Sequence, residues 1–180
     1  FLPGIASLVN KRKDPVYRAR TIGEKMSEFD IVGLNEVFEH KPRQMILDAL
    51  AERWGKSINS VVSPDPEDKR FNGGLAIATR LPILDSNTLT YSKGSSPKEY
   101  GLQADGFAAK GALHARIALA ASGPDAPSVD VFVTHLESKS DEIRRLQYTE
   151  LAGFIAKHSS PARPTIIMGD MNTRGNPSYQ

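Results

Sequence analysis

Five short apolar runs, each closed by polar or turn-forming residues, constrain the fold of this chain more than any other feature of its sequence. Runs of this length fit buried strands and are too short for a membrane-spanning helix. Between them, apolar residues recur at the spacing of amphipathic helices. The order helix, strand, helix, strand, strand, strand, helix, strand predicts a mixed α/β layered domain. The expected strands are residues 29–34, 75–79, 112–120, 129–134 and 164–168.

Three helices are expected, one before the first of these strands and two between later ones. Asp14 fits the N-cap and Pro15 the first turn of the first helix, and Pro42 opens the second. Ser138 and Asp141 form a capping box for the third. The expected apolar faces are Ile22, Met26 and Phe29 in the first helix, and Ile143, Leu146, Leu151, Phe154 and Ile155 in the third. Residues 63–72 and 92–106 read as polar loops, and strand 112–120 as half-buried with His114 and Arg116 opposite its apolar side.

Composition narrows the class of protein. The chain has 180 residues, of which 39% are hydrophobic, which suits one globular domain with a real core. Its net charge of +2 does not favour nucleic acid as a partner, whereas a phosphate substrate needs only local positive charge. The sequence has no cysteine, which excludes disulfides, thiolate zinc sites and a cysteine nucleophile. Phe1 replaces an initiator Met and no signal peptide is visible, so we expect that the natural N-terminus has been removed.

Polar side chains follow three of the expected strands. Asn35 and Glu36 follow the first, His135 the fourth, and Asp170 and Asn172 the last. Strand ends at one edge of a sheet are where α/β proteins build sites. A carboxylate such as Glu36 suits Mg²⁺, and Asn172 and His135 can donate to a phosphoryl oxygen. Asp170 can orient or deprotonate a water, or assist a leaving oxygen.

Each of these residues also has an ordinary structural interpretation. A glutamate after an apolar strand is usually the first exposed residue. Asp170 and Asn172 suit a turn, and a single histidine after a strand is more often structural than catalytic. The ordered combination, rather than any one residue, favours a hydrolytic site.

Four segments in this order resemble the endonuclease/exonuclease/phosphatase superfamily. They read DIVGLNE at 30–36, GGLAIATRLPI at 73–83, VTHL at 133–136 and IIMGDMN at 166–172. The resemblance implies a layered α/β sandwich with mixed β-sheets, incomplete in this chain, and residues 1–180 as a single truncated domain. It also implies a metal-binding Glu36 and active-site roles for His135, Asp170 and Asn172.

Within that superfamily, the chain is most similar to neutral sphingomyelinases and related phospholipid phosphodiesterases. Phe38 after Asn35-Glu36-Val37 fits their Asn-Glu-x-Phe variant, and Asp105 and Lys110 fit their Asp-x4-Lys-Gly segment. The resemblance implies that Lys110 supplies positive charge for a phosphodiester and that Asp105 holds it in place or releases it; the alternative is a surface ion pair. The Arg144, Arg145 and Gln147 stretch is similar to an Arg-x-x-Gln stretch of that branch.

The function implied by the resemblance is Mg²⁺-dependent hydrolysis of sphingomyelin or a related phospholipid, of the phospholipase C type. The alternatives are a nuclease or an inositol-phosphate phosphatase of the same superfamily, or a non-catalytic binding relative. We expect a monomer whose partner is a phospholipid at a membrane surface rather than nucleic acid. A secreted or membrane-peripheral location is favoured over a nuclear one.

Two features of the family pattern have no match here. The family has an Asn on an earlier strand, and a C-terminal Asp-His pair whose histidine acts as general base. Nothing after Asn172 supplies that pair, and His158 lies in a helix before the Asp170 segment. We therefore expect the catalytic base to lie outside this chain, which by itself could be inactive, and we predict that the parent protein is the enzyme.

Overall fold

The computed structural model describes residues 14–55, 58–66, 71–101, 107–119 and 127–173. The helices are α2 (Pro15–Met26), α3 (His40–Arg53), α4 (Pro97–Tyr100) and α5 (Asp141–His158). The strands are β1 (Ile31–Leu34), β2 (Asn59–Val62), β3 (Ala76–Thr79), β4 (Ile83–Thr90), β5 (Gly111–Ala118), β6 (Ser128–His135) and β7 (Thr165–Asp170). Among the described residues, no helix is both long and apolar enough to cross a membrane.

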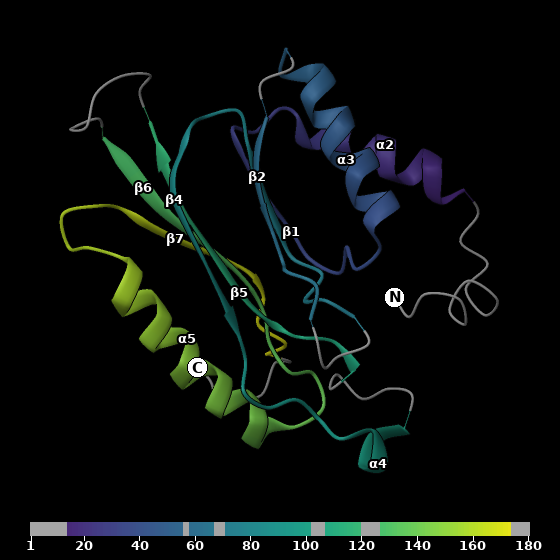
Figure 1. Cartoon of the computed structure of the whole chain (residues 1–180), viewed down its shortest axis with the longest axis vertical. Helices are drawn as coiled ribbons and strands as arrows, with labels where there is room; N and C mark the ends of the chain where they lie inside the picture. Colours follow the sequence, from purple (N-terminus) through teal and green to yellow (C-terminus); the bar gives the residue numbers. More distant parts are fainter. Residues whose placement is uncertain (1–13, 56–57, 67–70, 102–106, 120–126, 174–180) are drawn as a thin grey trace.

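The strands form two sheets, in the orders β1-β3-β2 and β4-β5-β6-β7. Neighbouring strands run antiparallel except β6 and β7, which are parallel. Helices α2 and α3 lie on the outer side of the smaller sheet, and α5 lies on the outer side of the larger one (Figure 1). The predicted mixed α/β layered fold is therefore confirmed.

The two sheets pack on each other through alternating side chains of their strands. In β3, Ile77 joins the cluster that holds Leu113 of β5 and Val131 of β6, whereas Ala76 and Ala78 join the cluster on the helix side. This period-two alternation lets one strand bury residues on both of its faces. All four residues of β3 are buried as a result.

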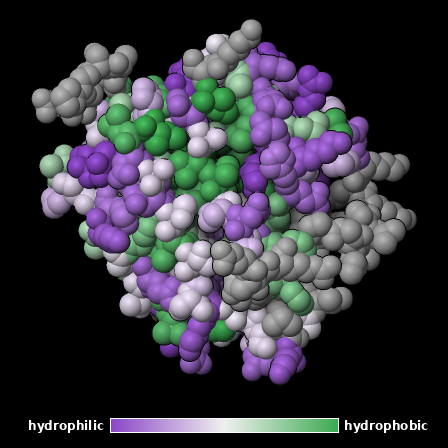
Figure 2. All heavy atoms as spheres, viewed as in Figure 1, coloured by the Kyte–Doolittle hydropathy of each residue, from purple (hydrophilic) through white to green (hydrophobic). Residues whose placement is uncertain are grey.

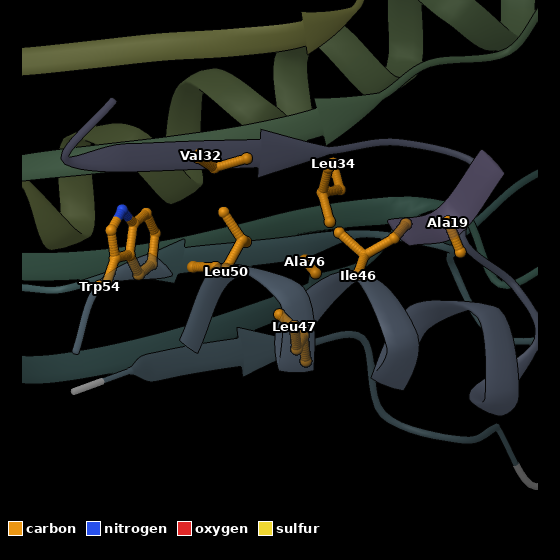
Figure 3. Close-up of a cluster of buried hydrophobic side chains, with 9 residues drawn as sticks. Ala19, Val32, Leu34, Ile46, Leu47, Leu50, Trp54 and Ala76 are labelled. Carbon is orange, nitrogen blue, oxygen red and sulfur yellow. The ribbon is translucent and has the colours of Figure 1, made fainter. Parts of the chain in front are cut away.

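Helix α3 covers the outer face of the smaller sheet. Leu50 and Trp54 lie beside Val32 of β1, and the side chain of Ile46 points toward Leu34 (Figure 3). Full burial of an aliphatic side chain such as Leu50 contributes about 1.5–3 kcal/mol. This contact fixes β1, and with it the turn that follows β1.

Helix α5 covers the outer face of the larger sheet in the same way. Phe132 of β6 meets Phe154 edge to face, with ring centroids 5.8 Å apart, and Leu136 and Leu151 complete the cluster. In the view of Figure 2, hydrophobic residues gather in the central part of the molecule, and the side that carries α2 and α3 is mainly hydrophilic. The buried clusters lie between the two sheets and beneath the helices on their outer faces.

Two strands and a short helix were not anticipated from the sequence. β2 and β4 are edge strands with one partner each, and most of their side chains are polar or exposed, so they lack an apolar run. Helix α4 lies within the expected loop 92–106. The expectation of a half-buried β5 was wrong, because α5 covers its second face and buries His114 completely.

The helix caps and faces were predicted in part. Asp14 caps α2 as expected, accepting a hydrogen bond from the Tyr17 N–H at 2.9 Å. The N-cap of α5 is Ser140 rather than Ser138, since Ser140 Oγ accepts from the Ile143 N–H at 3.3 Å.

The buried faces of both helices differ from the expected ones. Helix α2 buries Ala19 and Gly23 instead of Ile22 and Phe29, which are exposed. A Cβ at Gly23 would lie 2.6 Å from the Cβ of Ala49 on α3, so only glycine allows this approach. Helix α5 likewise buries Arg144 and Gln147 together with Leu151 and Phe154, and leaves Leu146 exposed.

Candidate active site

The candidate site lies where β6 and β7 end. Because these strands are parallel, their carboxyl ends coincide, and His135 is the register partner of Asp170. Gly169 adopts a φ of 133°, and a Cβ there would lie 1.9 Å from the carbonyl oxygen of Thr134. The glycine of the IIMGDMN segment therefore lets β7 approach β6 closely just before Asp170.

The carbonyl group of Leu136, the residue after β6, is a point of convergence. It accepts hydrogen bonds from Lys110 Nζ at 2.7 Å and from Asn172 Nδ2 at 2.8 Å. The Leu136 N–H donates to the carbonyl oxygen of Asp170 at 2.9 Å. Two other segments, the one with Lys110 and the one with Asp170 and Asn172, thus meet at one backbone residue beside His135.

Asp170 and Asn172 form a turn as well as part of the site. Asn172 has a φ of 51°, and its N–H donates to Asp170 Oδ1 at 2.9 Å. The carboxylate of Asp170 is exposed, whereas Asn172 is half-buried. The turn interpretation of this segment is therefore correct, and the turn itself places Asn172 on the Leu136 carbonyl.

Lys110 and His135 form the buried cationic part of the site. Lys110 Nζ lies 3.2 Å from His135 Nε2, and the two residues are 6% and 4% exposed. A protonated lysine has only donors, so His135 Nε2 accepts in this contact and the ring proton resides on Nδ1. His135 Nδ1 is itself buried, so the role that this arrangement gives His135 is to orient Lys110.

Beneath these groups, a hydroxyl chain joins β6 to the neighbouring strands. The Tyr91 hydroxyl lies 2.6 Å from Thr134 Oγ1, which donates to the Gly111 carbonyl oxygen at 2.9 Å. Burial raises the pKa of Tyr91 far above its ordinary value, and the hydrogen bond with Thr134 offsets this only in part. Tyr91 therefore stays neutral and supports the strand end.

Glu36 approaches the site from the smaller sheet. Its neighbour Asn35 donates from Nδ2 to the Thr134 carbonyl oxygen at 2.8 Å, which ties the turn after β1 to β6. Glu36 has a φ of 61°, and the following Val37 N–H donates to the Gly74 carbonyl oxygen at 2.9 Å. Backbone strain of this kind often occurs at functional sites.

The Glu36 side chain is the group best placed to receive a cation. It is exposed, and within the described part of the chain its carboxylate makes no hydrogen bond or ion pair. The same residues contain no group of three or more His, Asp or Glu that could enclose a metal ion. One carboxylate fits Mg²⁺, which commonly takes one or two carboxylates and completes its shell with waters and substrate phosphates.

The structure brings together most of the residues predicted from the sequence. Lys110, His135, Asp170 and Asn172 meet around Leu136, and Glu36 stands next to Asn35, which is bonded to β6. Asp105 lies outside the described residues. The Leu136 carbonyl could not be anticipated from the sequence, because a backbone group has no residue-type signature.

Comparisons with known proteins identify the family. The model of the Endonuclease/Exonuclease/phosphatase family matches residues 7–178. A sphingomyelinase C of Bacillus cereus is 26% identical over 181 residues, which cover 86% of this chain and 50% of the relative. The chain thus spans about half the length of the curated relative that it matches.

Solved structures share the fold. A mutant beta toxin of Staphylococcus aureus, crystallised with bound magnesium ions, matches with a TM-score of 0.76 and 20% identity, over 96% of this chain and 63% of the toxin chain. The D. rerio protein TDP2, complexed with a single-strand DNA product, matches with a TM-score of 0.60 and 18% identity, over 91% of this chain and 57% of its own. At these identities the matches establish the architecture.

Proposed function

Because the chain belongs to the endonuclease/exonuclease/phosphatase family, we propose that its strand-end site serves a metal-dependent phosphodiesterase that hydrolyses sphingomyelin or a related phospholipid. One observation carries the proposal. Lys110, His135 and Asn172 gather around the Leu136 carbonyl, directly beside the exposed carboxylate of Asp170. Donors and a carboxylate at one sheet edge are what hydrolysis of an anionic ester requires.

The donor side of the site would bind the phosphodiester. Asn172 uses one N–H of its amide on Leu136, and an amide has a second N–H that can reach a phosphoryl oxygen. His135 would hold Lys110 in place, and the Lys110 ammonium would add positive charge for the phosphodiester. Because these groups are fixed before the substrate arrives, they can stabilise charge that grows in the transition state without reorganising.

Asp170 would act on the attacking water or on the leaving oxygen. The water oxygen forms a bond to phosphorus as the bond to the lipid alcohol oxygen breaks, and the leaving oxygen receives a proton. We propose, following the resemblance, that a histidine of the parent protein accepts the proton of the water. Asp170 is then left to orient the water or to assist the leaving group.

Glu36 is the residue that would hold a Mg²⁺ ion, which when bound would neutralise negative charge on the phosphoryl group. The exposed carboxylate and its freedom from other described partners support this assignment. The magnesium ions bound to the structurally similar beta toxin support a divalent cation for this fold.

Similarity to sphingomyelinase C favours the lipid substrate over the alternatives. The products would be phosphocholine and ceramide, and the protein would act as a monomer at a membrane surface, secreted or peripheral to the membrane. The DNA product bound to TDP2 favours a nuclease as the second candidate. The net charge of +2 argues against that candidate, since nucleic-acid binding proteins usually carry a strong basic excess.

A panel of substrates tests the proposal on the full-length protein. Sphingomyelin vesicles, abasic DNA and an inositol phosphate are assayed in parallel, with Mg²⁺ and with a chelator. We expect metal-dependent release of phosphocholine. Cleavage of DNA or of the inositol phosphate instead would keep the family chemistry and refute the lipid substrate, and no turnover of any of them would favour a binding protein.

A further inference from the structure

The proposed chemistry leaves Arg144 and Gln147, the Arg-x-x-Gln stretch of α5, without a role. Both are buried, although they are polar residues of a surface helix. A buried polar group is costly unless it is hydrogen-bonded. Their partners therefore indicate why these residues lie on the inner face of the helix.

Both side chains bind the backbone of Glu137, two residues beyond His135. The Glu137 N–H donates to Gln147 Oε1 at 2.7 Å, and the Glu137 carbonyl oxygen accepts from Arg144 Nη1 at 2.6 Å. The Glu137 carboxylate accepts from the Ser95 N–H and the Lys139 N–H, both at 2.8 Å. The backbone N–H, the backbone carbonyl and the carboxylate of Glu137 are thus all hydrogen-bonded.

The Glu137 N–H belongs to the same peptide group as the Leu136 carbonyl. A peptide group is planar, so fixing the direction of its N–H fixes the direction of its C=O on the opposite side. Gln147 binds the N–H of this group, and Lys110 and Asn172 bind the C=O. One rigid plane thus connects helix α5 to two residues of the site.

The amide of Gln147 is itself firmly oriented. Gln147 is 0% exposed, and its Nε2 donates to the Lys93 carbonyl oxygen at 2.8 Å. With Nε2 committed to Lys93, Oε1 must point toward Glu137. The amide cannot turn over without losing both hydrogen bonds.

We propose that Gln147 is a positioning residue. It holds the Leu136–Glu137 peptide group in one orientation, so that the Leu136 carbonyl oxygen keeps the Lys110 and Asn172 side chains in place for the substrate. This role rests on the proposed phosphodiesterase function, because it acts through the donors of that site. Gln147 itself touches neither substrate nor metal.

The test uses Gln147→Met in the full-length protein, since methionine keeps the shape of the side chain and removes both hydrogen bonds. We expect kcat for sphingomyelin to fall about tenfold or more, because small displacements of catalytic groups are costly. KM should change less than about threefold, as for an interaction that matters mainly in the transition state. Gln44→Met is the matched control, because the side chain of Gln44 is exposed and donates a hydrogen bond to the exposed Asp48 on α3, away from the site.

A second readout does not depend on turnover. In protein labelled with ¹⁵N-asparagine, the side-chain amide signals of Asn172 should shift in Gln147→Met and stay in place in Gln44→Met. Glu150→Gln provides a further control, since Glu150 binds Ser92 in the same segment without touching the peptide group. If the Asn172 signals stay in place, or if Glu150→Gln moves them as much, the positioning role is refuted.

These two readouts separate the positioning role from the proposed function. Shifted Asn172 signals in a protein without phosphodiesterase activity would refute the proposed function. They would still support the connection from Gln147 to Asn172 through the Leu136–Glu137 peptide group. An active enzyme whose kcat is unchanged in Gln147→Met would refute the positioning role alone. Should Gln147→Met fail to fold, scalar coupling across the hydrogen bond from the Glu137 amide to the Gln147 side-chain carbonyl carbon tests the same contact in the wild type, and its absence would refute it.

Discussion

Two polar clusters lie at opposite ends of strands β5, β6 and β7. In one cluster the acidic side chain is buried, and in the other the acidic side chains are exposed. At the far end from the candidate site, Asp130 is 0% exposed and accepts hydrogen bonds from His114, Arg116 and Arg163. At the site, the acids Asp170 and Glu36 are exposed, and the buried groups are Lys110 and His135. We call the first group, with His158 stacked on His114, the Asp130 cluster.

The Asp130 cluster is closed by its own members. Burial alone would raise the pKa of Asp130, but the hydrogen bonds from His114, Arg163 and Arg116 outweigh it and hold the pKa below its usual value. The carboxylate of Asp130 therefore serves to join β5, β6 and the segment before β7 through hydrogen bonds. The acids of the site instead face solvent, where water, a cation or a substrate can reach them.

The largest effect on turnover should come from replacing Asp170, the acid at the end of β7. Asp170→Asn keeps the shape of the side chain and removes its charge, so turnover should fall about 10²- to 10⁴-fold, the usual range for a general acid or base. Stability should change little, because the side chain is exposed. Steady-state kinetics and denaturant unfolding of the same samples measure both; a loss of stability with retained turnover would reverse the assignment.

Asp130→Asn should give the opposite result. Removing one partner of a buried ionic cluster leaves the others uncompensated, and this typically costs about 3–5 kcal/mol. Turnover per folded molecule should stay within about twofold, since Asp130 lies at the other end of the strands. An unchanged unfolding free energy would show that the Asp130 cluster does not stabilise the fold.

The same comparison predicts how stability responds to acid. Burial, and then the neighbouring charge of His114, lower the pKa of His158 from 6.5. The unfolded chain therefore binds a proton more readily, and stability begins to fall as the pH drops below about 6.5. Asp130 adds a second loss, since its lowered pKa gives stability above 3.8 that disappears as the pH falls through the folded-state value.

Thermal unfolding between pH 7.5 and pH 3 measures both phases. His158→Gln should remove the first phase and leave the second, and Asp130→Asn should remove the second. A first phase that persists in His158→Gln would assign it to another group.

The smallest effect should come from an ion pair outside both clusters. Asp30 and Arg80 pair on the surface, with side chains 55% and 51% exposed. Exposed pairs contribute about 0–1 kcal/mol, so Asp30→Asn should lower the unfolding free energy by no more than this. A loss as large as that of Asp130→Asn would mean that burial is not what distinguishes the Asp130 cluster.

The sequence predicted the buried part of the fold well and its edges poorly. β3 and β6 are recognisable because strands buried between layers need continuous apolar runs. β7 carries such a run too, but the expectation that it is buried was wrong, because it is an edge strand with mostly exposed side chains. β2 and β4 escaped notice because an edge strand tolerates polar residues such as Asn59 and Asp85. Gln147 was not placed on the inner face of α5, since its partners are backbone groups that only the folded chain brings near.

The candidate site was predictable to a similar degree. His135, Asp170 and Asn172 stand in short motifs at strand ends, so their convergence could be expected from the order of the strands. The Leu136 carbonyl could not, because any residue offers the same group. The Leu136 carbonyl lies in the site because of the register of β6 and β7 and the orientation of the Leu136–Glu137 peptide plane.

Phosphocholine release from sphingomyelin, followed against Mg²⁺ concentration in the full-length protein, tests whether Glu36 serves a metal-dependent phosphodiesterase. Glu36→Ala is compared with Glu39→Ala, because Glu39 is an exposed glutamate three residues away that makes no side-chain cap to α3. We expect Mg²⁺-dependent turnover in the wild type and in Glu39→Ala, and its loss in Glu36→Ala. Equal turnover in the two variants, or turnover that ignores Mg²⁺, would contradict it.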